Sequence, residues 1–301
     1  MRVAYQGEPG AFSEAAVLRL LPDADPRPYP TFDDVFDAVH TGAVGLGVVP
    51  IENSIGGSIH RNYDLLVERD LSIVGEVQVP VVHNLLALPG VRIDEVRRVL
   101  SHPQALAQCA RFLRGLSHVE AIATYDTAGS AKMVRDEQRR DTAAIASERA
   151  GELFGLEALR TGVQDFDDNI TRFLTIGHQR AALAAPDKTS VVFTLRNEAG
   201  ALFKALSVFA LRGIDLSKLE SRPVPGRPWE YLFYADVAAA LEDPQCARAM
   251  ANLAEFAASL RTLGSYPRWR EPEVPPHMNN VRSSIDGVAA QPLSKKGALG
   301  G

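Results

Sequence analysis

The order of strand-like and helix-like segments near the N-terminus constrains the fold more than any other feature of this sequence. Arg2–Gln6 is an apolar run of strand type, and Ser13 follows a glycine-containing turn as the expected N-cap of a helix. A second helix is expected after Thr31, which has capping-box spacing to Asp34, and residues 43–49 form another apolar run. Strands that alternate with helices in this way predict a mostly parallel sheet with helices on its faces.

The pattern changes near residue 71, where apolar positions predict two long strands at 73–79 and 81–88. We expect these strands to cross from one lobe to another. A second α/β unit follows, with expected strands near 99–100, 119–123 and 143–146 and expected helices at 103–113 and 127–135. Residues 173–176 predict a last strand that returns to the first lobe. Two such lobes leave a cleft, and small ligands bind in clefts of this kind at the carboxyl ends of strands.

The C-terminal part of the chain has a different order of elements. After an alanine-rich linker at 179–188, the sequence predicts strand 190–195, helix 200–212, strands 214–222 and 230–237, helix 244–263 and strand 265–269. The order β-α-β-β-α-β is typical of an α+β ferredoxin-like sandwich. Residues 271–301 hold Pro, Gly, Ser and Asn without periodicity, so we expect a disordered tail there.

Composition argues against several classes of function. A formal net charge of −5 without a broad basic segment argues against a nucleic-acid partner. Cys109 and Cys246 form no CxxC pair, and the histidines show no ligand spacing, so no metal site is expected. No apolar run is long enough to span a bilayer, and the chain enters a strand at once without a secretion signal, so no membrane partner is expected. These features predict a cytoplasmic protein, and 301 residues are enough for two domains.

Four loops carry more small polar residues than a connection requires: 50–54, 101–104, 126–130 and 169–173. Each lies where a strand meets a loop or a helix. Three of them open helices, where free backbone N–H groups and the helix dipole favour anions. The hydroxyls, amides and one arginine of these loops suit a small carboxylate ligand. The alternative is that their Ser, Thr and Asn side chains act only as helix caps.

The same segments carry a resemblance to a known enzyme family. Residues 50–65 read PIENSIGGSIHRNYDL, residues 7–13 read GEPGAFS, residues 101–106 read SHPQAL and residues 169–173 read NITRF. In this order the four segments resemble the signatures of prephenate dehydratases. Residues 200–202 and 220–223 resemble the two phenylalanine-site motifs of the ACT domain that is fused to these enzymes. The resemblance covers about residues 2–270.

The resemblance implies an α/β catalytic domain with two lobes, similar to periplasmic binding proteins, followed by an α+β ferredoxin-like (ACT) regulatory domain. The expected catalytic domain spans 1–180, with a first lobe of about 1–75 and 160–180 and a second lobe of about 76–159. The regulatory domain is expected at 189–270, followed by the tail at 271–301. The implied reaction converts prephenate to phenylpyruvate with loss of water and carbon dioxide, without a cofactor, in phenylalanine biosynthesis.

The resemblance also assigns roles to individual residues. Thr171 is the expected catalytic residue, because its hydroxyl can donate a hydrogen bond to the departing oxygen. The residues expected to bind the substrate are Arg172, Asn53, Ser101, Gln108, Thr127 and Ser13. Arg172 has the planar fork that suits a carboxylate, but a structural ion pair is the alternative. Glu52 either belongs to the site or supports its loop, and His102 is either an acid or a helix cap.

The C-terminal motifs imply an allosteric site for L-phenylalanine in a homodimer or homotetramer. Its expected residues are Gly200, Ala201, Leu202, Asp215, Glu220, Ser221 and Arg222. Asp215 replaces the asparagine that is common in the family, although a carboxylate can also hold an ammonium group. Two other functions stay open: the same reaction on arogenate, and ligand binding without catalysis on the same two-lobed fold.

Overall fold

The computed structural model describes residues 1–178, 183–224 and 226–271, without the side chain of Pro228. The expected tail at 271–301 lies outside these residues except for Glu271. Met1–Trp269 form a single compact unit. Within the described residues, no helix is long and apolar enough to cross a membrane.

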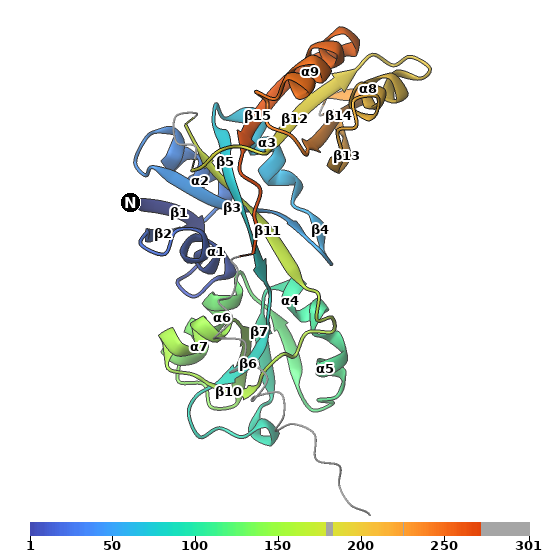
Figure 1. The fold of residues 1–301 in the computed structure, drawn as a ribbon. Coiled ribbons are helices and arrows are strands. Elements are labelled where there is room, and N and C mark those ends of the chain that lie inside the picture. Colours follow the sequence, from blue (N-terminus) through green and yellow to red (C-terminus); the bar gives the residue numbers. More distant parts are fainter. Residues whose placement is uncertain (179–182, 225, 272–301) are drawn as a thin grey trace, which may run out of the picture. The chain divides into compact units, whose positions relative to one another are not determined.

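The first lobe is built on a mixed six-stranded sheet (Figure 1). The strand order is β2 (Asp25–Tyr29), β1 (Arg2–Gln6), β3 (Leu46–Asn53), β11 (Ile170–Gly177) and β5 (Ser72–Pro80), and the short β4 (Gly57–Ser58) pairs with β3. Strands β1, β2 and β3 are parallel, whereas β11 runs antiparallel to both β3 and β5. The helices of this lobe are α1 (Phe12–Leu20), α2 (Phe32–His40) and α3 (His60–Glu68). The predicted alternation of strands and helices is confirmed in this lobe.

The first two helices differ in how their N-termini are capped. At α2, the Thr31 hydroxyl accepts a hydrogen bond from Asp34 N and the Asp34 carboxylate accepts one from Thr31 N, so the predicted capping box is confirmed. Helix α1 begins at Phe12, after Ala11, and Ser13 lies buried in its first turn. The prediction of Ser13 as the N-cap was therefore wrong.

The second lobe contains a five-stranded sheet. Its order is β10 (Glu157–Arg160), β6 (Asn84–Ala87), β9 (Thr142–Ala146), β7 (Arg98–Ser101) and β8 (Glu120–Ala123). Its helices are η1 (Ile93–Glu95), α4 (Pro103–Gln108), α5 (Ala110–Arg114), α6 (Thr127–Asp136) and α7 (Glu148–Phe154). The expected single helix at 103–113 is divided, because Cys109 leaves the helical backbone angles with φ −113° and ψ 22°.

The chain passes between the lobes twice, from β5 to β6 and from β10 to β11. Residues 76–80 were expected in the second lobe, but β5 pairs with β11 from Ser72 to Pro80 and therefore belongs to the first sheet. The physical reason is burial. Val77 and Val79 lie in the same apolar core of the first lobe as Phe173.

The C-terminal unit has the predicted β-α-β-β-α-β order. Its elements are β12 (Lys188–Leu195), α8 (Ala201–Ala210), β13 (Leu216–Val224), β14 (Arg227–Val237), α9 (Pro244–Phe256) and β15 (Ala257–Tyr266). The sheet order β13-β14-β12-β15 is that of a ferredoxin-like sandwich. Helix α9 ends at Phe256 rather than at residue 263, because the chain from Ala257 onward pairs with β12 as a long antiparallel strand.

The two faces of the C-terminal sheet have different partners. Helices α8 and α9 share an apolar core with one face, which includes Val191 and Phe193. The other face, with Val192 and Tyr234, packs in the core of the first lobe. Gly264 permits this close packing, because a Cβ atom there would lie 2.1 Å from the carbonyl oxygen of Ile73 on β5.

Candidate active site

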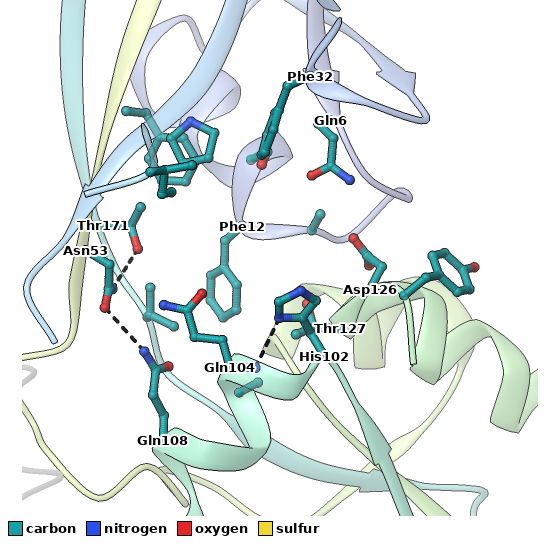
Figure 2. A pocket seen from close by; sticks show the side chains of 18 of the residues that line it. Gln6, Phe12, Phe32, Asn53, His102, Gln104, Gln108, Asp126, Thr127 and Thr171 are labelled. Carbon is teal, nitrogen blue, oxygen red and sulfur yellow. Dashed lines mark hydrogen bonds between the residues drawn. The ribbon is translucent and has the colours of Figure 1, made fainter. Parts of the chain in front are cut away.

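A cavity of about 490 Å³ lies between the two lobes (Figure 2). The first lobe contributes Phe12 and Ser13 from α1, Asn53 from the end of β3, and Thr171 from the start of β11. The second lobe contributes Gln104 and Gln108 from α4, and Asp126 and Thr127 from the start of α6. A volume of this size is usual for a small-molecule site.

The cavity brings together most of the residues that the sequence analysis selected for the cleft. Ser13, Asn53, Gln108, Thr127 and Thr171 all line it, although they come from five separate elements. They lie at or near the ends of their strands and helices. Their roles toward a substrate stay predictions.

Thr171 and Asn53 are neighbours across the β3–β11 ladder. Asn53 Nδ2 donates a hydrogen bond of 3.0 Å to Thr171 Oγ1. Both side chains are buried, with exposed fractions of 9% for Thr171 and 4% for Asn53. Because Thr171 Oγ1 accepts this bond, the hydroxyl proton of Thr171 is available for another acceptor.

Two further polar residues extend this contact: Asn169, which lies in the polar segment 169–173 but had no individual role in the prediction, and His83, which was not selected. Asn169 lies buried just before β11, and Asn53 Nδ2 donates to its Oδ1 at 2.7 Å. His83 lies buried between β5 and β6, and its Nε2 is 3.0 Å from Gln108 Oε1. A signal for His83 was present in the sequence, because a polar His-Asn pair interrupts the apolar run at 81–88.

The cavity lining combines apolar side chains with neutral polar ones. Of the described residues that line it, none is Lys or Arg, whereas Asp33 and Asp126 both carry carboxyl groups. Burial raises the pKa of Asp126, and the hydrogen bonds from the backbone N–H groups of Gly129 and Ala128 oppose this rise. The same carboxyl group caps α6 by accepting from Gly129 N at 2.9 Å.

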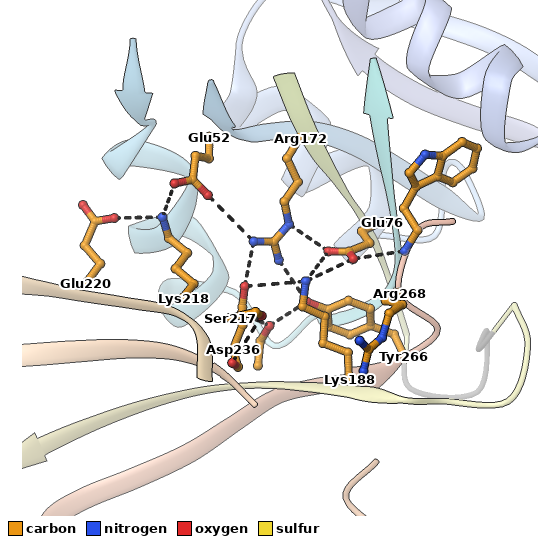
Figure 3. A network of polar contacts seen from close by, with 12 residues as sticks. Glu52, Glu76, Arg172, Lys188, Ser217, Lys218, Glu220, Asp236, Tyr266 and Arg268 are labelled. Atoms are coloured by element: carbon orange, nitrogen blue, oxygen red, sulfur yellow. Dashed lines mark hydrogen bonds and ion pairs between the residues drawn. The ribbon is translucent and has the colours of Figure 1, made fainter. Parts of the chain in front are cut away.

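The structure corrects the assignment of Arg172 as a ligand of the substrate. Its guanidinium does not line the cavity and lies in a buried charge network with the C-terminal unit (Figure 3). It contacts Glu76 of β5 at 2.7 Å and Asp236 of β14 at 2.6 Å. The alternative of a structural ion pair is the one that the structure supports. The physical reason is the strand period of two, which directs Thr171 and Arg172 to opposite faces of β11.

Lys188 and Tyr266 complete this network, which we call the Arg172 network: Arg172, Glu76, Asp236, Lys188 and Tyr266. Lys188 Nζ lies 2.9 Å from Glu76, and Arg172 donates to the Tyr266 hydroxyl at 3.2 Å. The network therefore joins strands β5 and β11 of the first lobe to β12, β14 and β15 of the C-terminal unit.

Three other assignments are decided by local contacts. Ser101 is fully buried and donates to the carbonyl of Ile145 at 2.6 Å, so the structure corrects its assignment to the substrate site. His102 caps α4 by accepting from Gln104 N through Nδ1. Glu52 forms an ion pair with Lys218 of β13 at 2.8 Å, which agrees with a supporting role for its loop.

The residues of the expected effector site fall into separate groups within one chain. Gly200, with φ +79°, precedes α8, and Ala201 and Leu202 begin this helix, which covers one face of the C-terminal sheet. Glu220 and Arg222 on β13 lie on the other face and contact Ser58 and Asp64 of the first lobe. Ser221 lies between Glu220 and Arg222 on β13, and Asp215 is exposed just before the start of this strand. One chain therefore does not bring all seven residues into one site.

Comparison with known proteins identifies the family of this chain. Residues 3–181 match the family model for prephenate dehydratase. A chloroplastic "arogenate dehydratase/prephenate dehydratase 2" of Arabidopsis thaliana is 49% identical over 89% of this chain and 73% of its own length. A prephenate dehydratase from Arthrobacter aurescens, solved in complex with L-Phe, has a TM-score of 0.82 and 30% identity, and covers 96% of this chain and 99% of its own. GqqA, described as a quorum-quenching acylase, has the same TM-score with 37% identity over 89% of this chain and 98% of its own.

The two-lobed α/β fold with a cavity between its lobes is the architecture of a protein that takes up a small ligand. The chain belongs to the prephenate dehydratase family of hydro-lyases. The expected cytoplasmic location is contradicted by the curated relatives, several of which are chloroplastic by name. That expectation rested on absent sequence features, and an absence of this kind does not decide where a protein is located.

Proposed function

We propose that this protein converts prephenate to phenylpyruvate in the cavity between its lobes. The observation that carries the proposal is the Asn53–Thr171 hydrogen bond at the wall of the cavity, which leaves the Thr171 proton for the substrate. The Thr171 hydroxyl donates a hydrogen bond to the oxygen of the hydroxyl group on the prephenate ring, as negative charge develops on that oxygen. A threonine is a weak acid, so its effect comes from a positioned hydrogen bond.

The reaction needs no electron acceptor. Loss of carbon dioxide breaks a C–C bond, and its electron pair becomes a double bond of the aromatic ring. The ring C–O bond breaks with its electron pair on oxygen, and one proton from solvent converts the departing hydroxide to water. The protein's part is to bind the two carboxylates and to stabilise the leaving oxygen.

Dehydration of arogenate is the second candidate, and the charge of the cavity favours it. Arogenate carries an ammonium group where prephenate has a carbonyl. Asp126 lies at the cavity, whose described lining residues include no Lys or Arg to neutralise it. Curated relatives at 45–49% identity are named arogenate dehydratases, some of them with both activities.

Parallel assays separate these candidates. The purified protein is given prephenate or arogenate, and phenylpyruvate and phenylalanine are measured as products. Asp126→Asn is expected to lower kcat/KM for arogenate by about tenfold or more and to spare prephenate, because it removes a charged acceptor for the ammonium. An equal effect on both substrates contradicts an ammonium contact at Asp126. No product from either substrate contradicts catalysis and favours ligand binding alone.

L-Phenylalanine binding to the C-terminal unit, with inhibition of the reaction, is the proposed regulation. Its support is the family motifs at 200–202 and 220–223, and a solved relative that is described in complex with L-Phe. The contacts of β13 with Ser58 and Glu52 give the unit a physical connection to the loop that carries Asn53. Inhibition requires that the effector binds two states with different affinity. A calorimetric titration without heat of binding contradicts this part of the proposal.

A second copy of the chain is proposed to complete the effector site. Leu202, Phe203 and Leu219 of the C-terminal unit have exposed fractions of 39%, 76% and 42%. Covering such side chains favours association. Light scattering is expected to give a dimer or a tetramer, and a monomer at assay concentration contradicts this proposal.

A further inference from the structure

Three side-chain amides at the cavity form a closed ring of hydrogen bonds. Asn53 Nδ2 donates to Asn169 Oδ1 at 2.7 Å, Asn169 Nδ2 donates to Gln108 Oε1 at 3.0 Å, and Gln108 Nε2 donates to Asn53 Oδ1 at 3.3 Å. We call these three residues the amide ring. Their exposed fractions are 4%, 1% and 9%, so each unsatisfied amide atom would be costly.

The orientation of the amide ring is fixed by the backbone. The N–H groups of Ile55 and Gly56 both point to Asn53 Oδ1, at 3.1 and 2.7 Å. Backbone N–H groups can only donate, so this atom must be the oxygen and the nitrogen must face Thr171. Each following amide of the ring then has one allowed orientation. The result does not depend on a choice between oxygen and nitrogen at any single amide.

His83 meets the ring from the side of the second lobe. Its Nε2 lies 3.0 Å from Gln108 Oε1, which also accepts from Asn169. Since Gln108 presents an oxygen, Nε2 must carry the proton. Burial lowers the pKa of His83, and the hydrogen bond to Gln108 opposes this shift. The imidazole of His83 is therefore neutral, and its Nδ1 is unprotonated. Nδ1 is buried and has no hydrogen-bond partner among the described residues.

We propose that His83 and Asn169 are positioning residues that maintain, at the other two amides, the direction that the backbone sets at Asn53, so that Asn53 donates to Thr171 and the Thr171 proton faces the substrate. The inference rests on the proposed reaction, in which Thr171 donates to the leaving oxygen. It adds two residues to the site and gives the direction of every hydrogen bond between His83 and Thr171. The ring also joins the lobes, because Gln108 belongs to α4 of the second lobe and Asn53 to β3 of the first.

The tautomer of His83 tests the direction without any measurement of activity. Nitrogen NMR of the full-length protein is expected to show a neutral imidazole with Nε2 protonated and Nδ1 bare. The chain has seven histidines, so the His83→Gln variant assigns the signal. A His83 with the proton on Nδ1 would require Gln108 to present its nitrogen, which reverses the ring and overturns the proposal.

Asn169→Asp tests the positioning role by kinetics. The new carboxylate places an acceptor oxygen against Gln108 Oε1, which is also an acceptor. If the Gln108 amide turned over, its oxygen would instead face Asn53 Oδ1, whose orientation the backbone N–H groups fix. We expect kcat to fall by about 10²-fold with KM little changed. The reason is that Thr171 loses its alignment while the contacts between protein and substrate remain. Asn84→Asp is the matched control, since Asn84 is 3% exposed on β6, away from the cavity lining, and its Oδ1 accepts from Gly162 N.

The two measurements have distinct outcomes. A kcat for Asn169→Asp that equals that of Asn84→Asp overturns the positioning role, even if wild-type turnover supports the proposed reaction. If Asn169→Asp does not fold, the His83 tautomer still decides the direction of the ring. A wild-type protein without turnover but with the expected tautomer refutes the proposed function and leaves the ring geometry intact.

Discussion

Replacing Thr171 by valine is expected to lower kcat by about 10²- to 10³-fold with little change in KM. Valine keeps the shape of threonine and removes its hydroxyl, so the loss reports the hydrogen bond to the leaving oxygen. The bond forms fully only as charge develops on that oxygen, and its absence therefore affects kcat more than substrate binding. Thr171→Ser keeps the donor and is expected to lose far less. The measurement is steady-state production of phenylpyruvate.

Thr175→Val is the matched control for this substitution. Thr175 lies on the same strand β11 and is fully buried. Its hydroxyl has no hydrogen-bond partner among the described residues, so valine removes no contact there. We expect wild-type kcat and equal or greater stability. A Thr171→Val protein that turns over prephenate as fast as Thr175→Val would exclude Thr171 from the mechanism.

Replacing Asp236 by asparagine is expected to lower the free energy of unfolding by about 3–5 kcal/mol. The side chain is only 8% exposed and lies 2.6 Å from Arg172. Asparagine keeps the volume but leaves Arg172 and Lys188 with only Glu76 as a buried countercharge. The loss is measured by urea denaturation at neutral pH, where both proteins unfold with similar exposure of surface.

Glu230→Gln provides the comparison on the same strand. Glu230 pairs with Arg227 at 3.4 Å, and both side chains are at least half exposed, so water screens the pair and little change is expected. A loss for Asp236→Asn as small as the loss for Glu230→Gln would contradict the role of the Arg172 network in stability.

The Arg172 network also predicts a direction for acid sensitivity. Burial by itself raises the pKa of Asp236, but the charges of Arg172 and Lys188 outweigh it and hold this pKa below its usual value. The stability from this carboxylate is therefore present above its unfolded pKa of about 3.9 and is lost as the pH falls through the folded value. The difference in stability between wild type and Asp236→Asn is expected to shrink over that acid range.

Much of the fold was predictable because local patterns and the final structure agree. The Thr31–Asp34 capping box and the alternation of strands and helices depend on neighbouring residues only. The end of α9 was not predictable in this way. Residues 257–263 are compatible with a helix, but hydrogen bonding to β12, a strand some 60 residues earlier in the chain, makes them a strand.

The candidate site also contains residues that the sequence indicated and residues that only the tertiary contacts revealed. Asn53, Gln108, Thr127 and Thr171 were selected through the family resemblance, whereas the polar loops at strand and helix ends predicted only a small-anion site at the edge of an α/β sheet. His83 was missed, and Asn169 had no individual role although its loop was selected, because what these residues do depends on partners that are distant in sequence.

Thr171 and Arg172 show what each level of structure decided. The sequence by itself determined that a hydroxyl and a guanidinium stand at adjacent positions just before a strand expected at 173–176, and the structure begins this strand earlier, at Ile170. Only the tertiary structure decided that the hydroxyl lines the cavity while the guanidinium is buried against Asp236 and Glu76. The reason is that a strand directs neighbouring side chains to opposite faces, and what covers each face depends on the packing of distant parts of the chain.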